Sequence, residues 1–358
     1  MNAKRDLLLV GSVGLKSAEE VFRTAADALG TRLHAIPDGE TGDRAVWVIW
    51  NRAAYDACDA LEPDPAEVAA GGRITSATEG IRKWGGGDQL EQGKQPPPRL
   101  RVKPGVAPAA IAFGPLGYVQ TTLESWETFR RLRDEGAIPA GTRFQVSLPT
   151  VAASMNAHIE PGSHEAVEPA LERRLFEEVA EICAAIPQDD MALQWDVSTE
   201  MGQVEEVRAH WFPDPLQGAT DRLARHCEQV PAGVELGIHL CYGSYGNRHW
   251  KEPDDLGNCV RVFNALAAKV SRPIHWVHMP VPIERDDAAF YAPLKELRLN
   301  GAKLYLGLIH LRDGVEGTRR RMAVADKFAA GYGIAAECGF GRRPPETIPE
   351  LLRVHAEA

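Results

Sequence analysis

The sequence predicts a (β/α)₈ barrel, on the basis of three observations. Short apolar segments alternate along the chain with segments in which apolar residues recur every three or four positions, the period of a helix. The apolar segments are nearly continuous, as is typical of parallel strands that helices cover. Roughly eight such strand–helix units fit in 358 residues, and a closed barrel takes about 250 residues plus insertions.

The expected strands leave room for a helix between most neighbours. In chain order they are 6–11, 32–37, 109–116, 143–149, 192–198, 234–242, 273–279, 303–310 and 334–339. Amphipathic segments lie between them, for example AEEVFRTAADALG after the first strand and LERRLFEEVAEICAAI before the fifth. An open, doubly wound sheet is the alternative fold. The segment after the first strand, GSVGLKS, argues against it because it does not match the phosphate-binding pattern G-x-G-x-x-G.

One segment has neither a helical nor a strand period. Residues 71–105 are rich in glycine, proline and charged residues. Such a loop is either an ordinary surface insertion or a lid over the mouth of the barrel, because long loops in compact domains often serve binding sites. We therefore expect one barrel domain over residues 1–358, interrupted by this inserted loop.

Composition and charge restrict the partners of the protein. The chain has 40 Lys+Arg and 50 Asp+Glu, a formal net charge of −10. An acidic surface argues against nucleic acid or an anionic membrane as the main partner. No apolar run approaches the about 20 residues of a membrane span. The start of the chain, MNAKRDLLLVG, is interpreted as a first strand rather than a signal peptide. We expect a cytoplasmic protein, monomeric or homodimeric, that acts on small molecules.

A histidine and two cysteines stand at the ends of expected strands. His239 and Cys241, in VELGIHLCY, are two residues apart and therefore project from the same face of a strand. Cys338 ends another strand, IAAECG. In a barrel the carboxyl ends of all strands meet at one mouth, where active sites are built. One nitrogen and two thiolates suit Zn²⁺ with a fourth position left for a further ligand. A purely structural role, as buried core residues, is the alternative.

These motifs resemble those of a known group of enzymes. GIHLCYG and the later AECGFGRR are similar to the zinc-binding pattern of cobalamin-independent methionine synthase. Its relatives include methylcobamide:coenzyme M methyltransferases and epoxyalkane:coenzyme M transferase, all on the uroporphyrinogen decarboxylase-like barrel. Weaker echoes are LVGSVG, LQWDVSTE and LGLIHLRDGVE, so that the resemblance covers about residues 6–345. It implies that His239, Cys241 and Cys338 bind zinc.

The sequence departs from this pattern at one ligand. The synthase supplies a glutamate ligand from the strand after the His-x-Cys pair, but here that strand reads PIHWVHMPVPIERDD, with no glutamate before Glu284. His278 falls near the equivalent position. Either His278 is the fourth ligand, or the zinc keeps three protein ligands and binds water or substrate.

Further candidate residues lie at the same rim. Asp196 and Glu200, in QWDVSTEMG, end the strand before the His-x-Cys strand, where the related enzymes hold their substrate with acidic residues. Helix capping is the structural alternative for them. His310 ends KLYLGLIH and matches a histidine of the family, in a position that suits a general acid. A core histidine bonded to a backbone carbonyl explains His310 equally well.

Two arginines and a tryptophan are candidates for substrate binding. Arg44 and Trp47 lie in IPDGETGDRAVWVIW, which follows the second strand, and Trp47 is three residues before Trp50. The tryptophans suit the wall of an apolar substrate pocket, although a polar turn that caps a helix accounts for most of this segment. Arg342, soon after Cys338, suits an anionic group of a substrate, or it is simply solvated.

The resulting function is a zinc-dependent alkyl transfer, in the first place of a methyl group, to a small-molecule thiol. Zinc deprotonates a bound thiol, which is otherwise mostly protonated at neutral pH. Two alternatives stay open: a zinc hydrolase or lyase that uses zinc-bound water, and a metal-free, decarboxylase-like barrel. No G-x-S-x-G, H-E-x-x-H or Walker pattern appears in the sequence.

Overall fold

Eight parallel strands form a barrel in the computed structural model, which describes residues 5–72, 97–243 and 249–358. Their order around the sheet is β1-β10-β9-β8-β7-β6-β5-β2. The strands are β1 (Leu7–Leu8), β2 (Ala35–Pro37), β5 (Arg143–Pro149), β6 (Met191–Val197), β7 (Glu235–Leu240), β8 (Trp276–Pro280), β9 (Lys303–Ile309) and β10 (Gly333–Ala336). Leu7 also pairs in parallel with Leu33, just before β2, and this contact closes the sheet. The predicted (β/α)₈ fold is confirmed.

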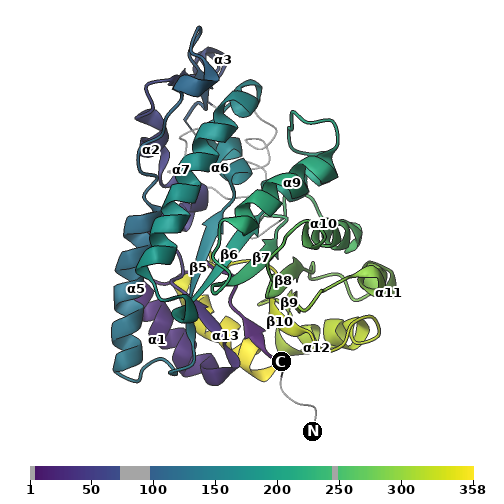
Figure 1. The fold of residues 1–358 in the computed structure, drawn as a ribbon. Coiled ribbons are helices and arrows are strands. Elements are labelled where there is room, and N and C mark those ends of the chain that lie inside the picture. The colour runs from purple at the N-terminus through teal and green to yellow at the C-terminus, as the bar shows by residue number, and fades with distance from the viewer. Residues whose placement is uncertain (1–4, 73–96, 244–248) are drawn as a thin grey trace.

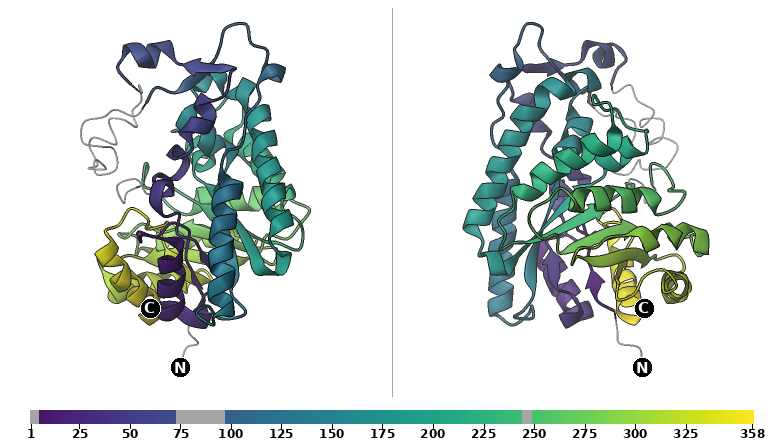
Figure 2. Two further views of the ribbon diagram at one scale, coloured as in Figure 1. Left: turned by 90° about the vertical axis from the view of Figure 1, so that its left-hand side faces the viewer. Right: turned by 45° about the vertical axis from the view of Figure 1, so that its right-hand side comes forward.

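Helices cover the outside of the barrel (Figures 1 and 2). The main ones are α1 (Ala18–Leu29), α5 (Tyr118–Asp134), α7 (His164–Ala185), α9 (Pro215–Glu228), α10 (Gly257–Ala267), α11 (Ala288–Tyr291), α12 (Gly314–Ala325) and α13 (Ile348–Glu357). Shorter helices are α2 (Arg52–Asp56), α3 (Pro65–Ala69), α6 (Val151–His158) and α8 (Thr199–Val204). In Figure 1, α1, α5 and α7 lie on one side of the strands, and α9 to α12 lie on the other.

The first helix shows how local sequence sets these contacts. Ser17 caps α1 by accepting a hydrogen bond from the backbone N–H of Glu20 at 3.3 Å. The buried ring of Phe22 meets Phe129 of α5 edge-on, with centroids 5.3 Å apart, and Phe144 of β5 at 6.0 Å. Aromatic pairs of this geometry stabilise a core by about 0.5–1.5 kcal/mol beyond the area that they bury. The helical period thus fixes α1 to the barrel wall.

The prediction of a strand at 109–116 is wrong. Pro108–Ala110 is a short 3₁₀ helix, and the residues that follow have no regular structure. Pro115 has no N–H for a strand ladder. The N–H groups of Leu116 and Tyr118 instead donate to the buried carboxylate of Glu178 in α7, at 2.8 Å for Tyr118. This segment leads from β4 (Leu100–Val102) to α5, and β2 pairs directly with β5.

A small two-stranded antiparallel sheet lies outside the barrel and was not predicted. It consists of β3 (Leu61–Pro63) and β4 (Leu100–Val102). The second strand falls within the loop expected at 71–105, so part of this loop has regular structure. Residues 73–96 of it lie outside the described residues, and the lid stays a prediction.

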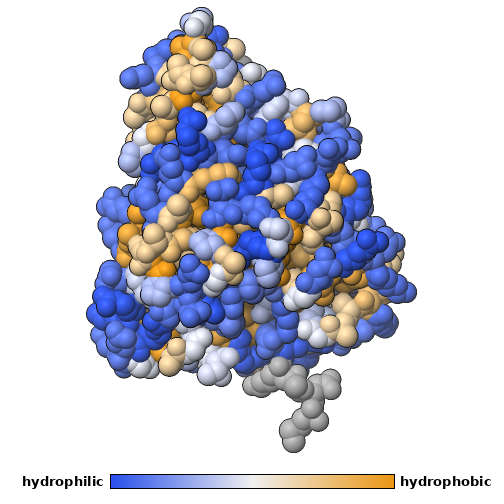
Figure 3. All heavy atoms as spheres, in the orientation of Figure 1, coloured by the Kyte–Doolittle hydropathy of each residue, from blue (hydrophilic) through white to orange (hydrophobic). Residues whose placement is uncertain are grey.

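The surface in Figure 3 is mostly hydrophilic, with hydrophobic side chains in small, separate patches. In the described part of the chain, the large hydrophobic side chains that are exposed are Ile49, Val68 and Val207. None of the helices in this part is long and apolar enough to cross a membrane.

A glycine in β7 makes room for an aromatic ring inside the barrel. Gly237 pairs with Trp276 of β8, and a Cβ atom at Gly237 would lie 1.8 Å from Cε2 of the indole. We expect Gly237→Ala to lower the free energy of unfolding by about 1–3 kcal/mol or more, because the ring has to move in a packed interior. Urea denaturation measures this effect. Gly141→Ala is the control, since nothing lies within 4 Å of a Cβ atom there. Equal stability of the two variants would contradict the packing argument.

Candidate metal centre

The structure brings the three predicted metal ligands together at the carboxyl ends of the strands. His239 lies in β7, Cys241 directly follows this strand, and Cys338 follows β10. The two sulfur atoms are 3.5 Å apart, and Sγ of Cys338 is 3.5 Å from Nε2 of His239. All three ligand atoms lie within 4.8 Å of one another. The cluster is formed because β7 and β10 end at the same mouth of the barrel.

The two separations of 3.5 Å fit a tetrahedral metal ion. Zinc bound at about 2.3 Å from sulfur and about 2.0–2.1 Å from nitrogen holds its ligand atoms roughly 3.5–3.8 Å apart. The N–H of Gly243 donates to Sγ of Cys241 at 3.2 Å, and such a bond favours the thiolate form that a metal needs. Two sulfurs and one imidazole nitrogen suit zinc better than they suit harder cations. The residues present therefore fit zinc.

His278 lies next to this cluster but behind His239. The two residues are register partners in β7 and β8, and their Nδ1 atoms are 2.7 Å apart. The Nδ1 atom of His239 faces away from the sulfur atoms, because Nε2 is the nitrogen near Cys338. Burial lowers the pKa of His278 well below its ordinary value, and the neighbouring imidazole lowers it further. The role of His278 as a fourth metal ligand stays a prediction.

Two buried carboxyl groups accompany the cluster. Asp196 of β6 is the register partner of His239, and Glu40 follows β2. Burial raises the pKa of Asp196 well above its ordinary value, and the carboxyl of Glu40 raises it further. Burial also raises the pKa of Glu40 to about 7, although Arg44 opposes the shift. Each pKa is also raised by Cys338, so both carboxyl groups lie near the cysteine cluster.

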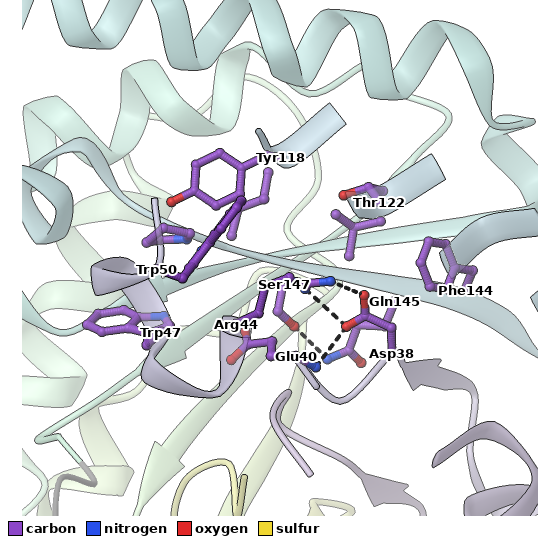
Figure 4. A pocket seen from close by; sticks show the side chains of 13 residues that line it. Asp38, Glu40, Arg44, Trp47, Trp50, Tyr118, Thr122, Phe144, Gln145 and Ser147 are labelled. Atoms are coloured by element: carbon purple, nitrogen blue, oxygen red, sulfur yellow. Dashed lines mark hydrogen bonds and ion pairs between the residues drawn. The ribbon is translucent and has the colours of Figure 1, made fainter. Parts of the chain in front are cut away.

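Glu40 belongs to a pocket that Figure 4 shows. The rings of Trp47, Trp50 and Tyr118 lie on one side of this pocket, and Trp50 meets Tyr118 edge-on with centroids 5.6 Å apart. The pocket is lined by Asp38, Glu40, Arg44, Trp47, Trp50, Tyr118, Thr122 and residues 144–149. The predicted aromatic residue Trp47 thus shares a pocket with the carboxyl of Glu40.

Arg44 lines the same pocket and forms an ion pair with a neighbouring carboxylate. Its guanidinium donates to both carboxylate oxygens of Asp38, at 2.5 and 3.2 Å. Asp38 also accepts a hydrogen bond from Ser125 at 2.8 Å. Glu40 and Trp47 have positive φ angles of 49° and 54°, a strained conformation for residues other than glycine. Strain of this kind concentrates at functional sites. Both strained residues, Glu40 and Trp47, line the pocket beside the Asp38–Arg44 pair.

His310 directly follows β9 and lies in a group of three polar side chains. Its Nε2 donates to the carbonyl of Val281 at 2.8 Å, and its Nδ1 is 3.6 Å from the carboxylate of Glu337. Nε2 of His249, which was not predicted, is 3.6 Å from the same oxygen. Burial lowers the pKa of His310 to about 3, with Arg321 adding to the effect. His310 is thus neutral at pH 7, and a role as general acid stays a prediction.

The two remaining candidates are Arg342 and Glu200. Arg342 follows Cys338 in the chain, and its charge lowers the pKa of Glu40, so it lies near the pocket. Glu200 is fully buried in α8, and burial raises its pKa to about 7. It is neither among the clustered ligands nor among the residues that line the pocket. His249 gave no sequence signal except its closeness in the chain to the His-x-Cys pair.

Comparison with known proteins identifies the fold. No protein-family model matches this sequence, and no curated protein matches it. Among solved structures, the "putative vitamin-B12 independent methionine synthase" of Listeria monocytogenes matches with a TM-score of 0.53 at 14% identity, over 94% of this chain and 84% of the other. A methyltransferase from Methanosarcina mazei matches with a TM-score of 0.51 at 13% identity, over 100% of this chain and 95% of the other. The chain has the fold of these two proteins.

The likeness is one of fold, and it agrees with the resemblance in the sequence. Both comparisons extend over nearly the whole chain. The barrel fold that the motifs implied is confirmed.

Proposed function

We propose that this protein is a zinc-dependent alkyltransferase, in the first place a methyltransferase, with a small-molecule thiol as the acceptor. The observation that carries the proposal is the cluster of His239, Cys241 and Cys338, in which Sγ of Cys338 lies 3.5 Å from both other ligand atoms, as in a tetrahedral site. Zinc held there would supply a charge that keeps a bound thiol in its nucleophilic thiolate form at neutral pH. The cluster lies at the barrel mouth, where a substrate can reach it.

The ligand set favours thiol alkylation over hydrolysis. Zinc hydrolases typically bind the metal with three histidines or with two histidines and a glutamate. The two sulfur ligands here donate more charge to the metal, which weakens its ability to acidify water. The same donation keeps a neighbouring sulfur nucleophilic. The carboxyl groups of Asp196 and Glu337 would have to serve as bases in the hydrolase alternative.

The two buried carboxyl groups favour an acceptor thiol that also carries a positive charge. The carboxyl of Glu40 disfavours the charged form of Asp196, and Cys338 disfavours the charged form of both groups. A cation placed between them would stabilise both carboxylates. We infer that the acceptor is a thiol with an ammonium group, which these carboxylates hold while the sulfur reaches the cluster. The alkyl donor would then bind in the aromatic pocket around Trp47.

A methyl-transfer assay tests the function and its acceptor together. The zinc-loaded protein should accelerate S-methylation of 2-aminoethanethiol by a simple donor such as methyl iodide, measured as thioether by mass spectrometry. Because the pKa of Glu40 is raised to about 7, its carboxyl is mostly protonated at pH 6 and ionised at pH 8. The KM for the aminothiol should therefore fall about tenfold from pH 6 to pH 8.

Two controls separate this effect from ionisation of the thiol itself. 2-Mercaptoethanol lacks the ammonium group, so its KM should not show the additional fall. Glu40→Gln removes the titrating carboxyl and should flatten the pH dependence for the aminothiol. If zinc-loaded protein gives no thioether above the protein-free rate, the transferase proposal fails. If both thiols show the same pH dependence, only the ammonium inference fails.

A further inference from the structure

A pair of buried histidines forms part of the metal centre. His239 of β7 and His278 of β8 are register partners, with imidazole centroids 4.8 Å apart and Nδ1 atoms 2.7 Å apart. Only 2% of His239 and none of His278 is exposed. Bulk water therefore does not reach this contact. A distance of 2.7 Å between two nitrogens requires a proton between them, since two lone pairs at this distance would repel each other.

The geometry decides which histidine donates this proton. Nε2 of His239 lies 3.5 Å from Sγ of Cys338, so Nε2 is the nitrogen that faces the metal position. A neutral imidazole carries one proton, and the nitrogen that binds a metal must have a free lone pair. With a metal bound at Nε2, the proton of His239 would therefore lie on Nδ1. Nδ1 of His278 would then accept the hydrogen bond from it.

The other nitrogen of His278 faces away from the cluster. A Cβ atom at Gly307 of β9 would lie 3.1 Å from Nε2 of His278, so this glycine makes room for the ring. The group of donor atoms within 4.8 Å of one another contains His239, Cys241 and Cys338 and, in the described residues, does not contain His278. As placed, His278 directs one nitrogen at His239 and the other at the neighbouring strand.

We propose that His278 is a positioning residue rather than a zinc ligand. It accepts the hydrogen bond from Nδ1 of His239 and thereby fixes Nε2 of His239 toward the metal. The inference rests on the zinc site of the proposed function and gives this site three protein ligands. Two thiolates and a neutral imidazole balance the charge of Zn²⁺, and the fourth position is left to the substrate thiol. Metal-bound histidines commonly have such a hydrogen-bond acceptor behind them.

Three variants of the full-length protein test this role. His278→Leu removes the acceptor, and His278→Asn places an amide oxygen about where Nδ1 lies. His355→Leu is the matched control, because His355 is also fully buried but lies in α13. Zinc affinity is measured by competition with a chromophoric chelator. We expect His278→Leu to weaken zinc binding about 10–100-fold, His278→Asn to restore most of the loss, and His355→Leu to leave affinity unchanged.

Zinc X-ray absorption distinguishes a positioning residue from a ligand. The outer-shell scattering of imidazole should indicate one histidine per zinc in the wild type and still one in zinc-loaded His278→Leu. Two imidazoles in the wild type and one in the variant would overturn the proposal while leaving the proposed function intact. Equal affinity losses in the His278→Leu and His278→Asn variants would also overturn it, because the hydrogen-bond acceptor would then have no role.

The nitrogen that carries the proton is observable directly. Long-range ¹H–¹⁵N spectra of the zinc protein labelled with ¹⁵N-histidine should show His239 protonated at Nδ1 and bound to metal through Nε2. A His239 that binds through Nδ1 would overturn the proposal. If the wild-type protein binds no zinc at all, both this proposal and the proposed function fail. If zinc binds as described but no thiol is methylated, only the proposed function fails.

Discussion

Cys241→Ser and Cys338→Ser are each expected to reduce the bound zinc from about one ion per chain to almost none. In the proposed zinc site each cysteine supplies one of three protein ligands, and the two sulfur atoms lie 3.5 Å apart. A serine hydroxyl does not ionise near neutral pH, so the variant offers zinc one thiolate fewer. Metal affinity depends on deprotonated ligands, and it falls steeply when one is removed. Atomic absorption after dialysis measures the metal content.

Cys183→Ser provides the matched control for these two variants. Cys183 is buried in α7, away from the clustered ligands, and burial raises its pKa to about 11. It is therefore a neutral thiol that packs as a small apolar side chain. This variant should keep its zinc and lose at most a little stability. Full retention of metal in both Cys241→Ser and Cys338→Ser would remove the basis of the metal centre.

A thiol acceptor is expected to bind the zinc directly through its sulfur. The three proposed protein ligands would leave one tetrahedral position, and a thiolate suits a centre that already has two sulfurs. X-ray absorption of the zinc-loaded protein should therefore gain one sulfur scatterer at about 2.3 Å when 2-aminoethanethiol is added. The added scatterer should displace a lighter oxygen or nitrogen atom. This change is large because sulfur scatters far more strongly than oxygen.

The same measurement separates the transferase from a hydrolase. Asp196→Asn should weaken the binding of the aminothiol, because one of the two carboxyl groups inferred to hold its ammonium group is lost. It should leave the zinc content unchanged, since Asp196 is not among the clustered ligands. A zinc spectrum that no thiol alters, together with turnover that consumes water alone, would favour the hydrolase in place of the transferase.

The sequence by itself determined the barrel and the three clustered residues. Near-continuous apolar strands separated by amphipathic helices leave few alternatives to a parallel, helix-covered sheet. Within that fold, the spacing of His239 and Cys241 puts both on one face, and Cys338 ends a strand at the same mouth. These predictions hold because strand period and the common direction of parallel strands are local rules. The Phe22 face of α1 follows from the helical period in the same way.

Tertiary structure alone decided the surroundings of this cluster. Apolar composition suggested a strand at 109–116, but Pro115 and the buried carboxylate of Glu178 direct those backbone N–H groups elsewhere. The orientation of His278 toward His239 depends on side-chain packing and on the space at Gly307, which no local pattern encodes. The effect of Glu40 on the pKa of Asp196 acts between the segment after β2 and strand β6, which are far apart in sequence. Burial and long-range charge act through space, so only the folded chain fixes them.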